Sequence, residues 1–243
     1  MQLSIVVPCY NEADNLVDLI AAFRAVAGER EDIEVIFVNN GSKDQSAGIF
    51  AEQLARPQNA FARVVDVVAN EGYGHGILSG LRHAKGEYLA WTHADLQTDP
   101  ADVVEAWKLL TASPDPKMSL VRGRRKGRPL LDRAFTGGMS LFASLALSSR
   151  LRDINAQPKV FHRSFFESIE AAAPKDFSLD LYWLYRANVR GLKSIEIPVF
   201  FHPRLRGEAK GGGSFKLKYK LTKRTARYIF ELRRNLRRAS PPK

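Results

Sequence analysis

Short apolar runs alternate, in the first half of the chain, with segments in which apolar residues recur every three or four positions. The short runs are rich in β-branched residues and predict strands at Leu3–Pro8, Ile33–Val38, Arg63–Val68, Glu87–Thr92 and Met118–Arg122. Helical periodicity predicts helices over residues 13–27, 44–55, 74–84 and 101–112. Strands that alternate with helices predict an α/β fold with a mainly parallel sheet covered by helices on both faces.

The second half of the chain is less regular. We expect a helix over about 131–150, a strand at Lys159–His162, helices near 163–172 and 178–190, and a strand at Ile195–Phe201. The stretch Gly-Arg-Arg-Lys-Gly-Arg-Pro at 123–129 predicts a mobile basic loop, and three consecutive glycines at 211–213 predict a flexible segment.

Composition is ordinary for a globular protein, with 45% hydrophobic and 26% charged residues. The single cysteine, Cys9, can form no internal disulfide, which fits a reducing compartment. We expect neither a signal peptide nor a membrane-spanning helix in this sequence, because no uncharged apolar run approaches about 20 residues.

Positive charge is concentrated in the last part of the chain. The whole chain carries +11, whereas residues 216–243 hold eleven basic residues and one acid, Glu231. Apolar and aromatic residues alternate with polar ones at 215–221 and then adopt a helical spread. We therefore expect a basic amphipathic helix that binds an anionic membrane surface. Phosphate contacts to a nucleic acid are an alternative for this tail, but they leave the motifs of the first half unexplained.

Polar clusters follow three of the predicted strands, at the edge where parallel strands bind ligands. These clusters are Cys9-Tyr10-Asn11-Glu12, Asn39-Asn40-Gly41-Ser42 and His93-Ala94-Asp95-Leu96-Gln97. The carboxylate of Asp95 and the amide oxygen of Gln97 are hard ligands that suit Mg²⁺ or Mn²⁺ shared with substrate phosphates. A polar loop that leads into a helix near Asp99 is the alternative.

Other site types find little support in the sequence. Gly72, Gly74 and Gly76 lack the spacing of a dinucleotide fingerprint, and we expect them to pack a helix close to the sheet. The five histidines show no metal-ligand spacing, and no nucleophile elbow is present.

Five segments, in order, resemble family-2 glycosyltransferases with the GT-A fold, a Rossmann-like sheet sandwiched by helices. Ser4–Glu12 resembles the family's opening strand, Val38–Asp44 its Asp-Asp-Gly-Ser-x-Asp segment, and Asn70–Gly74 its Asn-x-Gly-x-Gly. His93–Gln97 is similar to the Asp-Ala-Asp-Leu-Gln of the polyprenyl-phosphate branch, the dolichyl-phosphate mannosyltransferase type. Arg204–Lys210 is similar to the Arg-x-x-Gly-x-Ser-Lys of that branch.

The resemblance implies a UDP- or GDP-linked sugar donor. Pro8, Tyr10, Glu12 and Asn39 would line the base and ribose pocket, Asp95 and Gln97 would hold Mg²⁺ or Mn²⁺, and Arg204 and Lys210 would close over the donor phosphates. Other motif residues join the predicted donor pocket: Asn11, Asn40, Ser42, Gly72, Gly74, His93 and Ala94.

The resemblance also implies a polyprenyl-phosphate acceptor, whose ionised phosphate needs no strong general base. Arg125 and Arg133 match, loosely, arginines that hold it. The alternative acceptor is a sugar hydroxyl of a glycan precursor, which needs a carboxylate base such as Asp180 or Asp153. Asp180 is alternatively a charge at the start of a helix.

Three positions depart from the family's pattern. Asn39 and Asn40 replace paired acids, His93 replaces the first acid of its motif, and Ala209 replaces a serine. Neutral imidazole binds Mg²⁺ poorly, so the metal is expected to be weak or optional. A pseudoenzyme that binds nucleotide sugars without turnover is therefore a second reading.

The sequence thus predicts an inverting glycosyltransferase that moves a sugar to a polyprenyl phosphate. We expect a catalytic domain over 1–214 and a membrane-associating tail over 215–243. The expected location is the cytoplasmic, inner face of the plasma membrane, where the protein would be peripheral.

Overall fold

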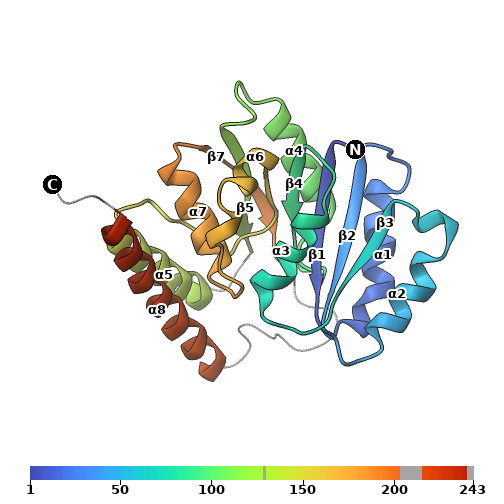
Figure 1. Ribbon diagram of the computed structural model, residues 1–243, viewed down its shortest axis with the longest axis horizontal. Coiled ribbons are helices and arrows are strands. Elements are labelled where there is room, and N and C mark those ends of the chain that lie inside the picture. Colours follow the sequence, from blue (N-terminus) through green and yellow to red (C-terminus); the bar gives the residue numbers. More distant parts are fainter. Residues whose placement is uncertain (128–129, 203–214, 240–243) are drawn as a thin grey trace.

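The computed structural model describes residues 1–127, 130–202 and 215–239, and it has a single seven-stranded sheet between two layers of helices (Figure 1). The strands are β1 (Leu3–Cys9), β2 (Ile33–Asn40), β3 (Ala62–Val67), β4 (Tyr88–Trp91), β5 (Ser119–Lys126), β6 (Lys159–His162) and β7 (Lys193–Phe200). The helices are α1 (Ala13–Ala27), α2 (Ser46–Leu54), α3 (Tyr73–His83), α4 (Ala101–Thr111), α5 (Leu130–Leu147), α6 (Arg163–Glu167), α7 (Leu179–Val189) and α8 (Phe215–Ala239), with short 3₁₀ turns at Pro57–Asn59 and Glu170–Ala172.

The strand order is β3-β2-β1-β4-β6-β5-β7. β6 pairs antiparallel with both β4 and β5, and the other strand pairs are parallel, so the sheet is mainly parallel as predicted. The carboxyl ends of β1, β2 and β4 therefore open at the same edge, which brings the three polar clusters together.

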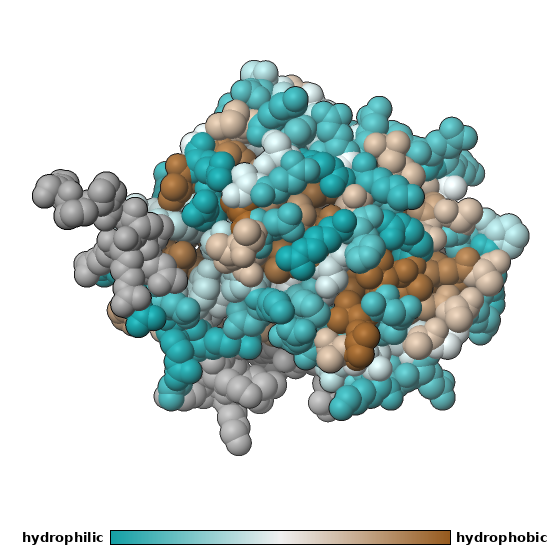
Figure 2. Space-filling model, in the orientation of Figure 1, coloured by the Kyte–Doolittle hydropathy of each residue, from teal (hydrophilic) through white to brown (hydrophobic). Residues whose placement is uncertain are grey.

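Alternate side chains of each strand feed two apolar cores. Ile5 and Val7 of β1 pack with α1, α2 and α4 on one face, whereas Val6 packs with α3, α5 and α7 on the other. This division follows from the period of two along a strand. In Figure 2 most of the visible face is hydrophilic, and hydrophobic side chains gather over the half that carries β2 and β3.

Gly80 shows how closely α3 approaches the sheet. A Cβ there would lie 2.4 Å from Cγ1 of Val6, and one on Gly76 would lie 2.9 Å from Cγ of Asn40. The prediction that glycines pack this helix close to the sheet is therefore confirmed at Gly76, and Gly80 adds a second close approach; Gly72 and Gly74 instead face the segment 174–176.

Two sequence predictions of local structure are wrong. The expected loop at 123–129 is strand as far as Lys126, because β5 pairs with β7 up to Lys126 opposite Phe200. The expected helix at 163–172 is the single turn of α6 followed by a 3₁₀ turn. The basic helix expected in the tail is confirmed, since α8 is helical from Phe215.

α8 packs against α5, and the two helices lie side by side (Figure 1). Ile229 and Leu232 of α8 are buried in the core on the α3 side of the sheet. Arg224 forms an ion pair with Asp176 at 3.1 Å, and its guanidinium lies 5.1 Å from the ring of Phe177. Among the residues that the structure describes, no helix has the length and apolar character needed to cross a membrane.

Candidate functional site

The segments after β1 and β2 are bound to each other by short polar side chains. Cys9 lies opposite Asn39 in the parallel ladder, so the two strands end together. Asn11 adopts a positive φ of 50°, its N–H donates to Oγ of Ser42 at 3.0 Å, and its Oδ1 accepts from the N–H of Lys43 at 2.8 Å. Asparagine suits this conformation because it tolerates the left-handed region and bonds nearby backbone.

Pro8, Tyr10 and Glu12 lie at the same edge and are partly exposed. Glu12 precedes the first residue of α1, and its carboxylate accepts a hydrogen bond from Nδ2 of Asn15 at 2.6 Å. The N–H of Glu12 donates to Oγ of Ser46 at the start of α2, at 3.2 Å. The residues that are predicted to bind the base and the ribose thus lie next to backbone that is held by hydrogen bonds.

The Asn39-Asn40 pair donates hydrogen bonds that a carboxylate pair could not. Nδ2 of Asn39 donates to Oδ1 of Asp66 on β3 at 2.8 Å, and Nδ2 of Asn40 donates to the carbonyl of Gly72 at 3.0 Å. Asp66 is exposed and stands opposite Asn39 in the β2–β3 ladder. A carboxylate is therefore present at this edge, on the neighbouring strand.

Gly72 and Gly74 begin α3 beneath the segment 174–176. A Cβ on Gly72 would lie 2.5 Å from the carbonyl oxygen of Lys175, and one on Gly74 would lie 2.5 Å from that of Pro174. Gly72 also has a φ of 132°, which side-chain-bearing residues rarely adopt. Both positions therefore require glycine for packing, whatever they contribute to a ligand.

The segment from His93 to Gln97 turns sharply after β4. Leu96 has a φ of 54°, and Oδ1 of Asp95 accepts a hydrogen bond from the N–H of Gln97 at 3.2 Å. Asp95 is 9% exposed and Ala94 is buried beside it. Gln97 bonds twice to His202 after β7: its Nε2 donates to the carbonyl at 3.0 Å, and its carbonyl accepts from the N–H at 2.9 Å. Hydrogen bonds therefore attach the chain after β7 to Gln97, one of the two candidate metal ligands.

The donor set at this turn fits a divalent ion only if a ligand completes the coordination. Within residues 1–127, 130–202 and 215–239, no three His, Cys, Asp or Glu side chains gather into a metal-binding group. Asp95 offers one carboxylate and Gln97 one amide oxygen. Mg²⁺ commonly binds through one or two carboxylates plus substrate phosphates, so these residues fit such an ion.

His93 is held in its neutral form. Burial is the main cause that lowers its pKa below the ordinary histidine value. The positive charges of Lys159 and Arg125 also lower the pKa, while Asp95 and Asp180 oppose the shift. The charges of Lys159 and Arg125 therefore act on His93 in the β4 turn.

Lys159 and Asp180 form a buried ion pair beneath the site. Both side chains are almost inaccessible to solvent, and Nζ of Lys159 also donates to the carbonyl of Ala156 at 3.1 Å. The ammonium group lies 5.4 Å from the ring centroid of Trp91 and 5.8 Å from that of Trp183. Burial lowers the pKa of Lys159, and Asp180 opposes that shift.

Gln157 links this pair to α3. Its Nε2 donates to Oδ1 of Asp180 at 3.2 Å and to the hydroxyl of Tyr73 at 3.0 Å. The Tyr73 ring stacks on Phe177, with centroids 4.8 Å apart. Asp180 lies in the first turn of α7, as expected for a charge at the start of a helix, but its partner is a buried lysine.

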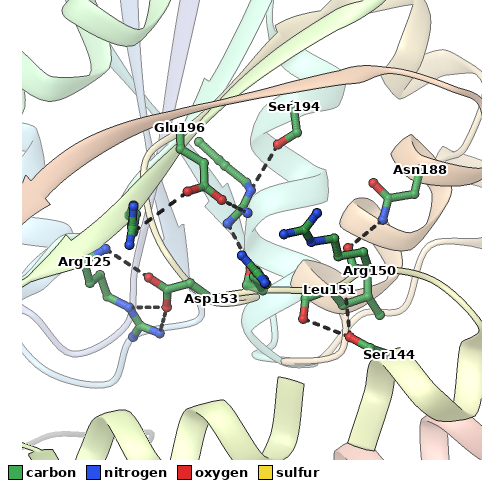
Figure 3. Close-up of polar contacts among 11 residues, drawn as sticks. Arg125, Ser144, Arg150, Leu151, Asp153, Asn188, Ser194 and Glu196 are labelled. Carbon is green, nitrogen blue, oxygen red and sulfur yellow. Dashed lines mark hydrogen bonds and ion pairs between the residues drawn. The ribbon is translucent and has the colours of Figure 1, made fainter. Parts of the chain in front are cut away.

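A basic cavity of about 700 Å³ lies between β5, α5 and the segment after α5. Asp153 is an acidic residue of its lining. Basic side chains dominate the lining: Arg124, Arg125, Lys126, Arg133, Arg150 and Arg152. Figure 3 shows Arg125 and Asp153 pointing toward each other, and Nε of Arg125 donates to Asp153 at 2.8 Å. The structure therefore brings Arg125 and Arg133 to one cavity.

The cavity wall is fixed by contacts from α5 and from Phe201, the residue after β7. Oγ of Ser144 accepts from the N–H of Leu151 at 2.9 Å, which ties α5 to the following segment (Figure 3). The Arg125 guanidinium lies 5.9 Å from the ring of Phe201. Asp153 has a φ of 41°, so its carboxylate is held by a strained turn and by both the side chain and the N–H of Arg125.

Arg204 and Lys210 lie outside the described residues, as does Ala209. Residues that sequence reasoning missed are Asp66, Lys159 and Gln157. Asp66 interrupts the apolar run of β3, and Lys159 begins an otherwise apolar strand. Either irregularity in the sequence could have marked Asp66 or Lys159 as unusual, but neither indicates which residue it would bond to.

A family model and several named proteins match this sequence. The model for Glycosyl transferase family 2 matches residues 4–138. An undecaprenyl-phosphate 4-deoxy-4-formamido-L-arabinose transferase from Edwardsiella ictaluri is 31% identical over 223 residues, covering 86% of this chain and 63% of the relative. The protein of that name from Pseudomonas fluorescens is 27% identical over 216 residues, covering 86% and 59%. The chain spans about three-fifths of the length of these relatives.

Solved structures with the same fold include two with bound nucleotides. Glucosyl-3-phosphoglycerate synthase from Mycobacterium tuberculosis in complex with UDP has a TM-score of 0.72 at 16% identity, covering 95% of this chain and 79% of that one. A mannosyltransferase from Pyrobaculum calidifontis in complex with GDP-Man and Mn²⁺ has a TM-score of 0.61 at 20% identity, covering 87% and 58%. At such identities the likeness concerns the fold, which is the predicted GT-A fold. With its family model matched over more than half of its length, the chain belongs to glycosyl transferase family 2.

Proposed function

We propose that the protein transfers a sugar from a UDP- or GDP-linked donor to a polyprenyl phosphate, with inversion at the sugar carbon. The observation that carries this proposal is the basic cavity near the strand-end edge: Arg125 in the cavity lies 5.9 Å from the ring of Phe201, and the adjacent His202 bonds to Gln97 in the β4 turn. A donor phosphate site and an acceptor phosphate site close together are what such a transfer requires. The names of the sequence relatives also support a polyprenyl-phosphate acceptor.

In this proposal, the edge after β1 and β2 binds the donor nucleoside. Pro8, Tyr10 and Glu12 border the base and ribose, and Asn11 and Ser42 fix the backbone around them. The Asn39–Asp66 pair presents a carboxylate to a ribose hydroxyl or a base N–H, which is a favourable charge-assisted acceptor. Gly72, Gly74 and Ala94 would contact the donor through their backbone atoms. Asn40 acts by holding Gly72.

Asp95 and Gln97 would hold Mg²⁺ or Mn²⁺ against the donor diphosphate, with neutral His93 beside them. The ion would supply positive charge where the diphosphate gains negative charge. Arg204 and Lys210 would add their charges from the segment that follows His202, whose backbone bonds to Gln97.

The acceptor phosphate would bind in the basic cavity, held by Arg125 and Arg133. One of its ionised oxygens attacks the anomeric carbon of the sugar while the bond from that carbon to the diphosphate oxygen breaks. The nucleoside diphosphate leaves with the electron pair, and attack from the opposite side inverts the configuration. No proton has to be removed, so no general base is needed.

Transfer to a sugar hydroxyl is less well supported. That reaction needs a free carboxylate base, whereas the two candidates are both ion-paired: Asp180 with Lys159 and Asp153 with Arg125. We further propose that residues 1–214 form the catalytic domain and that residues 215–243 associate with the cytoplasmic face of the membrane, where the acceptor phosphate is exposed.

A transfer assay with purified protein tests the proposal. We expect incorporation of sugar into undecaprenyl phosphate from one member of a panel of UDP- and GDP-sugars, and none into a neutral lipid-linked glycan. A Mn²⁺ titration of the transfer reaction with His93→Asp tests the ion site. The added carboxylate should lower the Mn²⁺ concentration at which transfer is half-maximal. Binding of a nucleotide sugar without turnover on either acceptor would identify a pseudoenzyme and refute the transferase.

A further inference from the structure

The outer face of α5 carries an apolar stripe that no described residue covers. Leu145 is 73% exposed and Leu141 is 61% exposed, one helical turn apart, and Phe135 and Phe142 are also exposed. The opposite face is buried, with Ala143 and Leu147 in the core. A stripe of large apolar side chains on a surface helix is unusual in a monomer and indicates an interaction site.

α8 extends this stripe and adds positive charge. The exposed ring of Phe230 lies 6.1 Å from that of Phe142, so the two helices share an apolar seam. Helical spacing places Lys223, Arg227 and Arg234 on the same side of α8 as Phe230, and all three are exposed. An apolar seam flanked by cations complements an anionic lipid bilayer, which offers hydrocarbon beneath negative headgroups.

The basic cavity opens beside this stripe. Arg133, Ser140, Leu141 and Ser144 of α5 line the cavity, and Leu141 belongs to both the cavity wall and the apolar stripe. A molecule with a phosphate head and a hydrocarbon tail could thus place its phosphate among the arginines and its tail along α5. A docked bilayer would present such a head at the level of the cavity.

We propose that α5 and α8 together form a bilayer-docking surface, made of Phe135, Leu141, Phe142, Leu145 and Phe230 with the flanking cations of α8. The apolar side chains enter the boundary between headgroups and acyl chains, and the cations lie among the headgroups. The catalytic domain then contributes to the membrane attachment through α5, and docking orients the cavity toward the lipid phosphates. The surface adds α5 to the membrane attachment of residues 215–243 in the proposed function, and the identity of the phosphate in the cavity rests on that function as well.

Vesicle co-sedimentation with the full chain tests the docking surface. We expect Phe135→Glu/Leu145→Glu to weaken binding to vesicles of phosphatidylcholine and phosphatidylglycerol by at least about tenfold, because two large apolar side chains no longer enter the bilayer. Leu109→Glu, on α4, is the matched control: Leu109 is 44% exposed and lies away from the surface, so its replacement should leave binding unchanged. Vesicles of phosphatidylcholine alone should bind wild type more weakly.

Two further measurements separate the outcomes. Wild type and Phe135→Glu/Leu145→Glu should transfer sugar equally to a short, water-soluble prenyl phosphate, since neither residue lines the cavity. Absence of transfer by wild type would refute the proposed function and leave the vesicle result standing. Unchanged vesicle binding by the double variant would overturn the docking proposal. So would a shift from dimer to monomer in sedimentation velocity without a change in vesicle binding, which would identify a contact between two copies.

Discussion

Asn39 on β2 donates a hydrogen bond from Nδ2 to Oδ1 of Asp66 on β3, at 2.8 Å, where the two residues stand opposite each other in the parallel ladder. The pair has one amide and one carboxylate where two carboxylates would repel. The departure from the family's acidic pattern at Asn39 is thus matched by an acid on the adjacent strand, outside the motif itself.

We predict that Asn39→Asp lowers the free energy of unfolding by about 1–2 kcal/mol, because it removes a hydrogen bond to a charged group and opposes two carboxylates. The exchange Asn39→Asp/Asp66→Asn restores one amide and one carboxylate and should recover most of that loss. Urea unfolding of both single variants and the double variant measures the coupling. Simple additivity of the two single effects would contradict a direct interaction.

Asp95→Ala should reduce transfer by about a hundredfold or more while the protein stays folded, because it removes the carboxylate proposed to face the donor diphosphate. Asp95→Asn is the matched variant, since its side-chain oxygen can still accept the hydrogen bond from Gln97. It should lose transfer as well if the charge is required. Near-normal turnover by either variant, with the circular dichroism of wild type, would refute the donor-site model.

Asp180→Leu should lower the free energy of unfolding by about 3–5 kcal/mol, because it leaves the buried ammonium of Lys159 without its partner. Adding Lys159→Met removes that unpaired charge and should restore much of the stability. Guanidinium unfolding of the single and double variants tests this. If Asp180 were instead a general base, the double variant would be as stable as wild type but inactive on every acceptor.

Asp102 gives the protein a pH-dependent stability. Burial, together with the negative charge of Asp99, raises the pKa of Asp102 to about 6, above its unfolded value of 3.8. The folded state therefore binds this proton more tightly, so the contribution is fully favourable below pH 3.8 and is lost as the pH rises through about 6.

We predict that Asp102→Asn is more stable than wild type by about 1–2 kcal/mol near pH 8, after allowance for the partial solvent exposure of Asp102. The difference should shrink through about pH 6 and vanish near pH 4. Thermal or urea unfolding across this range provides the measurement. A difference that does not change with pH would show that Asp102 is not the titrating group.

Deletion of residues 215–243 would be a poor test of membrane binding by α8. Ile229 and Leu232 are buried in the core, so their loss should also destabilise the fold. Charge reversal avoids this problem. Replacing the exposed Lys223, Arg227 and Arg234 by glutamate should weaken binding to anionic vesicles by about tenfold or more, at about 1 kcal/mol per charge, and spare nucleotide binding.

The matched control reverses three exposed lysines elsewhere, Lys85, Lys117 and Lys193, which gives the same change in net charge. That variant should bind vesicles much more tightly than the α8 variant. Equal losses in the two variants would mean that net charge, not the position of α8, determines vesicle binding. Isothermal calorimetry with the donor nucleotide checks that the nucleotide site is intact.

Apolar periodicity alone determined the strands and helices of the first half, because a two-residue or a 3.6-residue repeat is a local property of the chain. It did not predict the extension of β5 to Lys126, since Arg124, Arg125 and Lys126 show no apolar alternation. Their strand geometry comes from pairing with β7, more than seventy residues later in the chain. A pattern within one segment carries no information about such a partner.

For the candidate site, too, the sequence determined one part and the tertiary structure another. The sequence determined which residues follow the strands, and parallel strands with a common edge brought Asn11, Asn39 and Asp95 to one side of the sheet. Only the tertiary structure decided that Asp66 is the acid beside Asn39, that Lys159 neutralises Asp180, and that α5 and α8 share one exposed apolar seam. These relations join residues from separate elements, and their energies depend on burial and distance, which arise only when the chain is packed.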